Sequence, residues 1–183
     1  ITQAINENLS AEGLFGMYNH SIRWELGIRK VAFYFREGDV WQCMTHGGVR
    51  EELMKADIGE ELVRYRNKQG LENSQHPVLD EFDLIIPVLH KNTPIAYVLI
   101  GGFSEEEDVY NKVQFVTTLS NVIAVAIENK RMFREQLRQE VVNREVELAA
   151  EIQKTLVPNK LPSAKQFQLS SIYKPHFAVG GDF

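Results

Sequence analysis

The sequence predicts an α+β fold, in which an antiparallel sheet has helices on both faces and is followed by a long, dimeric coiled-coil helix. Two pairs of strand-like segments, each pair joined by a turn, predict the sheet. A stretch from about Glu105 to Leu156 has no proline or glycine and carries apolar residues at steps of three and four, which predicts the helix. Globular helices average roughly eleven residues. We therefore expect this one to have a partner along its length.

Composition limits the classes of function. With 183 residues, of which 44% are hydrophobic and 25% charged, the chain has the balance of a globular protein rather than a disordered one. A net charge of -5 with acids and bases interspersed argues against a nucleic-acid partner. A single cysteine, Cys43, excludes an internal disulfide and favours a cytoplasmic location. No apolar run approaches eighteen residues, so we expect no membrane contact.

The N-terminal part predicts helices that precede the sheet. Residues 1–9 are interpreted as the end of an incoming helix. The sequence starts at Ile1 rather than at Met, so we expect it to be a piece of a larger protein. Ser10 is a suitable N-cap for the next helix, and Gly27 would end it. The apolar side of that helix would carry Leu14, Met17, Ile22 and Leu26.

Two hairpins and a short helix account for the middle of the chain. Residues 30–36 and 40–46 predict the first hairpin, and residues 82–90 and 95–102 predict the second. Pro87 cannot donate to a strand ladder and therefore predicts an edge or a bulge. The spacing of Asp57 and Glu60 predicts a short helix over 58–69, closed by Gly70. The strands are almost continuously apolar, so we expect a sheet of five or six strands covered on both faces.

This order of elements, with the segment LGIRKVAFYFREGDVW, resembles a GAF domain, a sensory fold of the PAS-like type, over residues 10–128. The resemblance implies a ligand face beneath the short helix, where members of the family bind cyclic nucleotides, tetrapyrroles or small metabolites. The ligand of this chain is unknown from its sequence, and many members bind none.

Few residues of this domain are candidates for chemistry. Cys43 lies within a strand and is interpreted as a packing residue rather than a chromophore anchor. His46 and His90 stand at strand ends, where a solvated or capping histidine is commoner than a metal ligand. Asn111 and Lys112 match only a fragment of the cyclic-nucleotide motif and are interpreted as a solvated helix face. We predict no catalytic residue in the chain.

The long helix carries a seam suited to a parallel homodimer. Alternating steps of three and four predict that seam at Val116, Leu119, Ile123, Ala126, Lys130, Phe133 and Leu137. A second step of four leads to Val141, which is a stutter that locally unwinds the supercoil. Residues 129–158 are accordingly interpreted as a coiled-coil linker. Its expected signalling positions are Leu137, Val141, Leu148, Ile152 and Leu156.

The end of the chain, from ELAAEIQKTLVP to YKPHFAVGGDF, is similar to the start of an RsbU-like, SpoIIE-type serine/threonine phosphatase of the metal-dependent class. The matching residues are Glu147, Leu148, Ala149, Ile152, Gln153, Leu156, Pro158, Tyr173, Pro175, Val179, Gly180, Gly181 and Asp182. Residues 159–183 would then be the truncated start of the catalytic domain. The resemblance implies partner-switching signal transduction, with a phosphorylated anti-sigma-antagonist type protein as the substrate of the intact enzyme.

By the same resemblance, Asp182 would be a ligand of one of two Mn or Mg ions in the intact phosphatase. Such ions need several oxygen ligands, so we expect no cofactor and no activity in this fragment. Two other classes of signalling protein share features with this sequence. A histidine kinase is excluded for this stretch, since no histidine lies between Glu105 and Leu156. GGDF also resembles the diguanylate cyclase signature, but the segment that precedes it in that family is missing here.

Overall fold

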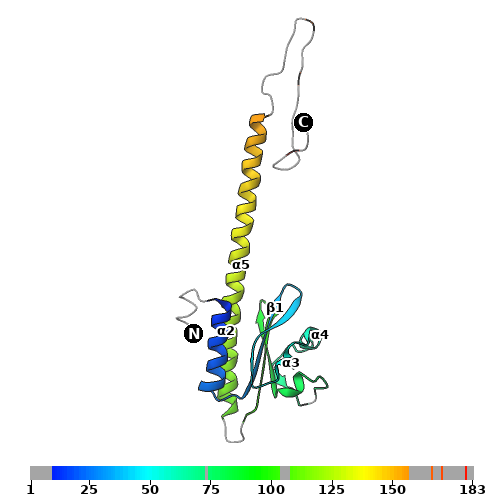
Figure 1. The fold of residues 1–183 in the computed structure, drawn as a ribbon, viewed down its shortest axis with the longest axis vertical. Coiled ribbons are helices and arrows are strands. Elements are labelled where there is room, and N and C mark those ends of the chain that lie inside the picture. Colours follow the sequence, from blue (N-terminus) through cyan, green and yellow to red (C-terminus); the bar gives the residue numbers. More distant parts are fainter. Residues whose placement is uncertain are drawn as a thin grey trace. The chain divides into compact units, whose positions relative to one another are not determined.

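Figure 1 shows the computed structural model, which describes residues 10–72, 74–103 and 108–156 together with residues 166, 170 and 180. The chain divides into two compact units, Ile1–Asn129 and Lys130–Phe183. The first unit contains a five-stranded antiparallel sheet, and the 48 residues of helix α5, Val109–Leu156, belong partly to each unit. This confirms the α+β fold class predicted from the sequence.

Helix α2 (Ala11–His20) begins at the predicted cap. The Ser10 hydroxyl accepts a hydrogen bond of 3.2 Å from the amide of Gly13, which satisfies one of the free donors of the first turn. A π-helical turn, η1 (Ser21–Glu25), continues the helix, and Gly27 follows it with a φ of 69°. Glycine adopts this left-handed conformation without the steric cost that a Cβ atom adds. Gly27 therefore ends the helix as predicted.

Both predicted hairpins are present. The sheet has the order β2-β1-β5-β4-β3. The strands of the hairpins are β1 (Lys30–Glu37), β2 (Val40–Gly47), β4 (Leu84–His90) and β5 (Thr93–Gly101), and the short edge strand is β3 (Gln69–Gly70). Lys91 and Asn92 turn the second hairpin, both with positive φ. Pro87 pairs with Tyr97 on one side only, because β3 reaches no further along β4 than Ile85. The predicted edge position of Pro87 is thus confirmed.

The helix predicted over 58–69 is wrong. Asp57 Oδ1 does accept from the Gly59 amide at 2.9 Å, but the helix that follows, α4 (Gly59–Leu62), has only four residues. A separate turn of helix, α3 (Glu51–Met54), precedes it. At the end of the predicted helix, Gln69 and Gly70 instead form strand β3, which pairs with β4 at the sheet edge. A helix continuing to Gln69 would forfeit those pairings.

The sheet has a hydrophobic core on each face, as the apolar strands predicted. One core lies between the sheet and helices α2 and α5, and it includes Phe15, Tyr18, Phe33 and Val116. The other is covered by α3, α4 and the 3-10 turn η2 (Leu79–Glu81). Among the described residues, no helix is both long and apolar enough to cross a membrane.

Candidate functional site

The sheet face beneath α3 and α4, where a GAF ligand would be expected, is filled by side chains. Tyr34 donates a weak hydrogen bond of 3.8 Å from its hydroxyl to Met54 Sδ. The rings of Trp41 and Tyr97 meet edge to face, with centroids 4.9 Å apart. The Tyr97 hydroxyl is buried and has no hydrogen-bond partner in the described part of the chain. This face is therefore an aromatic core with one unsatisfied polar atom.

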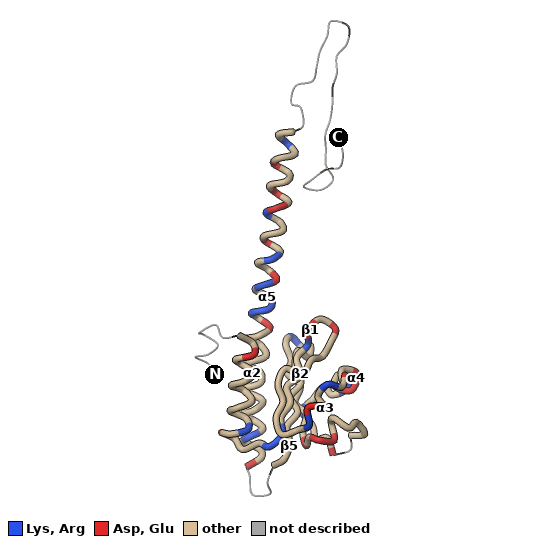
Figure 2. The backbone as a smooth tube through the Cα atoms, in the orientation of Figure 1, with Lys and Arg blue, Asp and Glu red and all other residues tan. Residues whose placement is uncertain are grey.

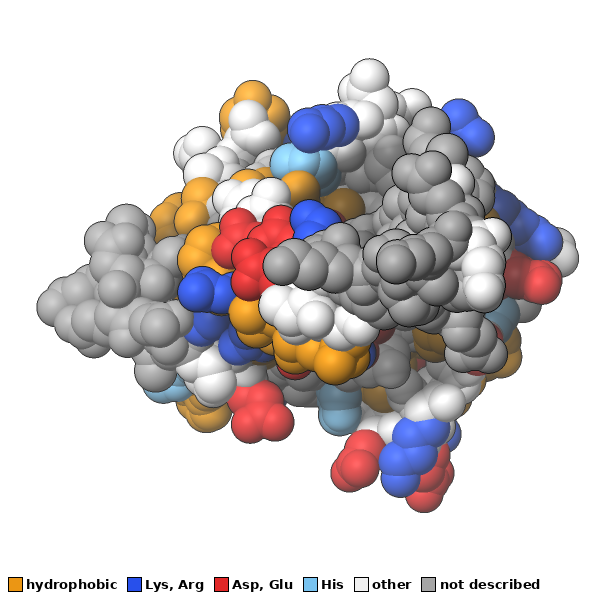
Figure 3. All heavy atoms as spheres, turned by 90° about the horizontal axis from the view of Figure 1, so that it is seen from above, with side chains coloured by type: hydrophobic (Ala, Val, Ile, Leu, Met, Phe, Trp, Pro, Cys, Tyr) orange, Lys and Arg blue, Asp and Glu red, His pale blue; other side chains and the backbone are white. Residues whose placement is uncertain are grey.

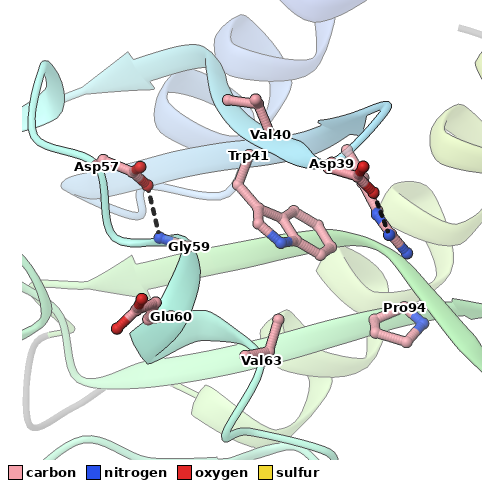
Figure 4. A pocket seen from close by; sticks show the side chains of 9 residues that line it. Asp39, Val40, Trp41, Asp57, Gly59, Glu60, Val63 and Pro94 are labelled. Carbon is pink, nitrogen blue, oxygen red and sulfur yellow. Dashed lines mark hydrogen bonds and ion pairs between the residues drawn. The ribbon is translucent and has the colours of Figure 1, made fainter.

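A cavity of about 350 Å³ lies at the rim of this face, beside the turns of both hairpins. It is lined by Arg36, Asp39, Val40, Trp41, Asp57, Gly59, Glu60, Val63 and Pro94. In Figure 4 the Trp41 indole extends from β2 between α4 and the strand that carries Pro94. Asp39 is paired with Arg36 at 3.3 Å, and Asp57 accepts from the Gly59 amide. An aromatic ring beside carboxylates suits a small polar or cationic ligand.

Cys43 packs against the aromatic core on this face. Its Sγ lies 3.6 Å from the Thr45 carbonyl oxygen, and burial raises the pKa of the thiol to about 11. Burial likewise raises the pKa of the neighbouring Tyr34 hydroxyl. Because the thiolate is the reactive form of cysteine, Cys43 is a poor nucleophile at neutral pH.

The two candidate histidines lie apart in the sheet. His46 belongs to β2, where its backbone carbonyl accepts a hydrogen bond of 2.7 Å from Asn19, and His90 ends β4. No group of three or more His, Cys, Asp or Glu side chains in the described ranges could hold a metal ion. Asn111 is exposed in the first turn of α5, where Asp108 accepts from its amide. Thus none of these residues belongs to a ligand constellation.

Charged residues of the GAF unit form ion pairs and are mixed in sign. Lys30 Nζ lies 2.8 Å from Glu81, and Arg50 lies 3.4 Å from the other oxygen of the same carboxylate. The hydrogen bond from Lys30 is the main cause that lowers the pKa of Glu81. On the face shown in Figure 3, basic and acidic side chains are interspersed over the surface.

The five predicted signalling positions of helix α5 are all exposed. Their exposed fractions are 47% for Leu137, 58% for Val141, 53% for Leu148, 61% for Ile152 and 75% for Leu156. The first half of the predicted seam needs correction, because Val116 and Ile123 are fully buried in the core against the sheet. These two side chains cannot also face a partner helix.

The two motifs at the end of the chain meet through one glutamine. Gln153 Nε2 donates to the Gly180 carbonyl oxygen at 3.1 Å, and Gln153 Oε1 accepts from the Gly180 amide at 2.8 Å. Both atoms of a primary amide thereby pair with one backbone unit. Asp182, the predicted metal ligand, lies outside the described residues. The described residues offer no ligand set for the Mn or Mg ions of the phosphatase class.

Two hollows on the surface were not predicted from the sequence. The rim cavity collects residues from two turns and from α4, which lie far apart in the chain. A second hollow lies between α2 and α5 and includes Met17, Phe115 and Val122. The sequence placed Met17 on the apolar side of its helix, whereas 38% of it is exposed. The sequence signal for this hollow is the lack of charged residues over 113–127 of α5.

Comparison with known proteins identifies the fold. No protein-family model and no curated protein matches the chain. Among solved structures, it resembles the GAF domain of a phosphoenolpyruvate-protein phosphotransferase from Coxiella burnetii, at 18% identity and a TM-score of 0.54 over 73% of this chain and 92% of that one.

Two further neighbours have the same fold. A GAF domain of a sensor histidine kinase from Pseudomonas syringae pv. tomato matches at 15% identity and a TM-score of 0.53, over 75% of this chain and 86% of that one. A GAF domain/HD domain protein from Geobacter sulfurreducens matches at 12% identity and a TM-score of 0.52, over 70% of this chain and 98% of that one. The chain therefore has a GAF domain fold, and at these identities the likeness concerns the fold alone.

Proposed function

We propose that this chain is the sensory, regulatory and dimerisation region of a bacterial SpoIIE-type serine/threonine protein phosphatase that acts in partner-switching signal transduction. The GAF fold supplies the sensor, and helix α5 links it to the phosphatase motifs. The substrate of the intact, cytoplasmic enzyme would be a phosphorylated anti-sigma-antagonist type protein. Mn or Mg would be held in the catalytic domain, with Asp182 as one ligand.

The pairing of Gln153 with Gly180 is the observation that carries this proposal. Gln153 belongs to the helical motif and Gly180 to the glycine-rich motif, and these two segments carry the phosphatase resemblance. Their reciprocal hydrogen bonds, of 2.8 and 3.1 Å, tie the helix to the backbone two residues before Asp182. A rotation or shift of the helix would therefore displace the segment that bears the metal ligand, which is a switch of the helix-shift type.

The exposed stripe on the later part of α5 supports the dimeric linker. A lone helix in water gains little from apolar side chains that remain about half exposed, as Leu137, Leu148 and Ile152 do. Pairing with the same helix of a second copy would bury all of them at once. A homodimer through α5 is therefore the form in which we expect the linker to transmit a signal.

Phosphatase activity tests the proposal. The protein with its complete catalytic domain should release phosphate from a phosphoserine protein in the presence of Mn, and Asp182→Asn should abolish that release. Asp80→Asn is a matched control, because Asp80 lies in the turn η2 of the sensor. Full activity in Asp182→Asn, or no Mn-dependent activity in the unmodified protein, would contradict the assignment.

A small-molecule receptor is the second candidate, and the rim cavity favours it. The volume of about 350 Å³ admits a compact ligand, and Trp41 and Glu60 offer it a ring and a carboxylate. Calorimetry with nucleotides and amine metabolites would detect such a ligand, and Trp41→Ala should then weaken its binding. If no compound changes the melting temperature, the sensor acts as a structural dimerisation module instead.

A further inference from the structure

The outer edge of strand β2 is open. β2 is the last strand in the sheet order β2-β1-β5-β4-β3, so within the described part of the chain it has a partner strand on one side only. Such an edge is a template for another extended chain, and proteins commonly block it with lysine or proline. β2 has neither, because its sequence is VWQCMTHG. In Figure 2 it is tan throughout, whereas α4 and the turn after β1 carry red segments. The composition of β2 therefore lets this edge accept a further strand.

The register of the first hairpin shows which backbone groups face outward. In a two-residue hairpin the residues that flank the turn form a hydrogen-bonded pair, and bonded and non-bonded pairs then alternate. Glu37 and Val40 flank the turn, so Trp41 and Cys43 belong to non-bonded pairs with β1. Their N–H and C=O groups therefore point away from β1. Because each residue has one donor and one acceptor, the two residues offer a partner strand about four hydrogen bonds.

The far end of the same edge is closed. The register shifts by one residue after Cys43, so Met44 is bulged and ends the regular pairing. Beyond the bulge, the Asn19 side chain of α2 donates to the His46 carbonyl oxygen at 2.7 Å. This contact occupies an outward-facing group of β2. The open part of the edge is therefore limited to residues 40–43.

The rim cavity adjoins the open part of the edge and is acidic. Trp41 lines it from β2, and Asp57 and Glu60 line it from the start of α4. In Figure 4 the Trp41 indole extends from β2, and both carboxylates lie to one side of it. The charge of Arg36 is matched by Asp39, which lies 3.3 Å from it. Asp57 and Glu60 therefore give the lining residues an excess of negative charge.

A residue paired with Trp41 would lie beside this cavity. Residues directly opposite each other on neighbouring strands point to the same face of the sheet, with Cβ atoms about 5 Å apart. The Trp41 side chain points to the face covered by α3 and α4, where its ring and that of Tyr97 have centroids 4.9 Å apart. A lysine or arginine opposite Trp41 would lie along the indole ring, with its charge near Asp57 and Glu60.

We propose that the open edge of β2 and the rim cavity together form a docking site for an extended, basic segment of a partner protein, which adds to the sheet as a strand. The backbone of that segment pairs with Trp41 and Cys43, and its lysine or arginine opposite Trp41 occupies the cavity.

Charge complementarity identifies the occupant as a basic partner. The acidic cavity calls for a cation, whereas the same edge of a second copy would bring an uncharged strand and a second acidic cavity. The inference rests on the receptor candidate of the proposed function, because it uses the same cavity, and it is independent of the phosphatase.

A modified peptide tests the strand addition. The probe is acetyl-Thr-Val-Thr-Lys-Thr-amide, whose lysine and valine would pair with Trp41 and Cys43. The 183-residue chain carries Trp24→Phe, so that Trp41 is its only tryptophan and its fluorescence gives the dissociation constant. N-methylation of the valine and lysine amides keeps the charge but removes two backbone donors, and it should weaken binding at least about tenfold. Equal binding of both peptides would overturn the proposal.

A charge substitution tests the cavity. Glu60→Gln should weaken binding of the unmethylated peptide at least about threefold at low salt, because one carboxylate near the lysine is lost. Glu12→Gln is the matched control, since Glu12 is also exposed but belongs to α2, on the opposite face of the sheet. Equal dissociation constants for the two variants would overturn the role of the cavity.

Three further outcomes separate this inference from the proposed function. If N-acetyl-lysine methylamide binds as tightly as the peptide, the cavity is a receptor for small cations and the strand addition is overturned. If the peptide separates a dimer of the chain into monomers in sedimentation equilibrium, a second copy occupies the edge and the basic partner is overturned. If the peptide does not bind at millimolar concentration, the docking site is overturned, while calorimetry with small amines still decides the receptor candidate.

Discussion

The hydroxyl groups of Tyr18 and Ser120 lie 2.7 Å apart in the core between helices α2 and α5. The Ser120 hydroxyl also donates to the Val116 carbonyl oxygen at 2.6 Å, so Tyr18 is the donor to Ser120. Both side chains are fully buried, and burial raises the pKa of Tyr18. This bond fixes α2 to α5 on the back of the sheet.

Removal of Ser120 should expose the cost of an unsatisfied hydroxyl. Ser120→Ala leaves the buried Tyr18 hydroxyl without its acceptor, and we expect the free energy of unfolding to fall by about 1–3 kcal/mol. Urea denaturation measures this change. The double variant Tyr18→Phe with Ser120→Ala should lose less than the sum of the single variants. Simple additivity would show that the bond contributes nothing.

Gly48 should tolerate no side chain. Its φ is 74°, and a Cβ atom there would lie 1.9 Å from the Arg29 carbonyl oxygen. Gly48→Ala must displace backbone, so we expect a loss of more than about 3 kcal/mol in unfolding free energy. Gly70→Ala is the control, because its Cβ would meet only the Asp83 oxygen at 3.8 Å. Similar melting temperatures for the two variants would contradict the structure.

Cys43 should react slowly with alkylating reagents in the folded protein. With a pKa of about 11 rather than the ordinary 9.0, its thiolate is about 100-fold less populated at pH 8. Iodoacetamide labelling followed by mass spectrometry should show at least that retardation relative to the chain unfolded in guanidinium chloride. Equal labelling rates would mean that the thiol is not buried and that its pKa is not raised.

The raised pKa of Cys43 also predicts that the folded protein loses stability at alkaline pH. Between pH 9 and pH 11 the unfolded chain releases the Cys43 proton while the folded chain retains it, so the unfolding free energy falls as the pH rises through this window. The contribution is fully present below pH 9. Cys43→Ser should flatten that part of the stability curve, and an unchanged slope would be evidence against the assignment.

The sequence predicted those features that depend on local chemistry. Ser10 and Gly27 bound the first helix, and both hairpins follow their turn residues. The helix over 58–69 failed because strand β3 forms through pairing with β4, a contact that no local pattern reports. Val116 and Ile123 have the spacing of a seam, but the same spacing serves a helix packed on its own sheet. The rim cavity depends entirely on tertiary contacts.

The stutter between Leu137 and Val141 should be needed for regulation. Deletion of the single residue Arg138 places Val141, Leu148 and Ile152 three, ten and fourteen positions after Leu137, which restores a strict heptad and tightens the local supercoil. In the intact phosphatase we expect this deletion to alter phosphatase activity at least about tenfold in one direction, and deletion of a complete heptad, which keeps the register, serves as the control. Unchanged regulation after the one-residue deletion would remove the stutter from the mechanism.

The coupling of the linker to the catalytic domain is tested most directly by phosphate release from the intact enzyme with Gln153→Ala. The account predicts that loss of both hydrogen bonds to Gly180 lowers Mn-dependent activity at least about tenfold. The control, Gln136→Ala on the same helix, should keep full activity. Equal activity in both variants would contradict the transfer of a signal from the helix to the phosphatase through Gln153.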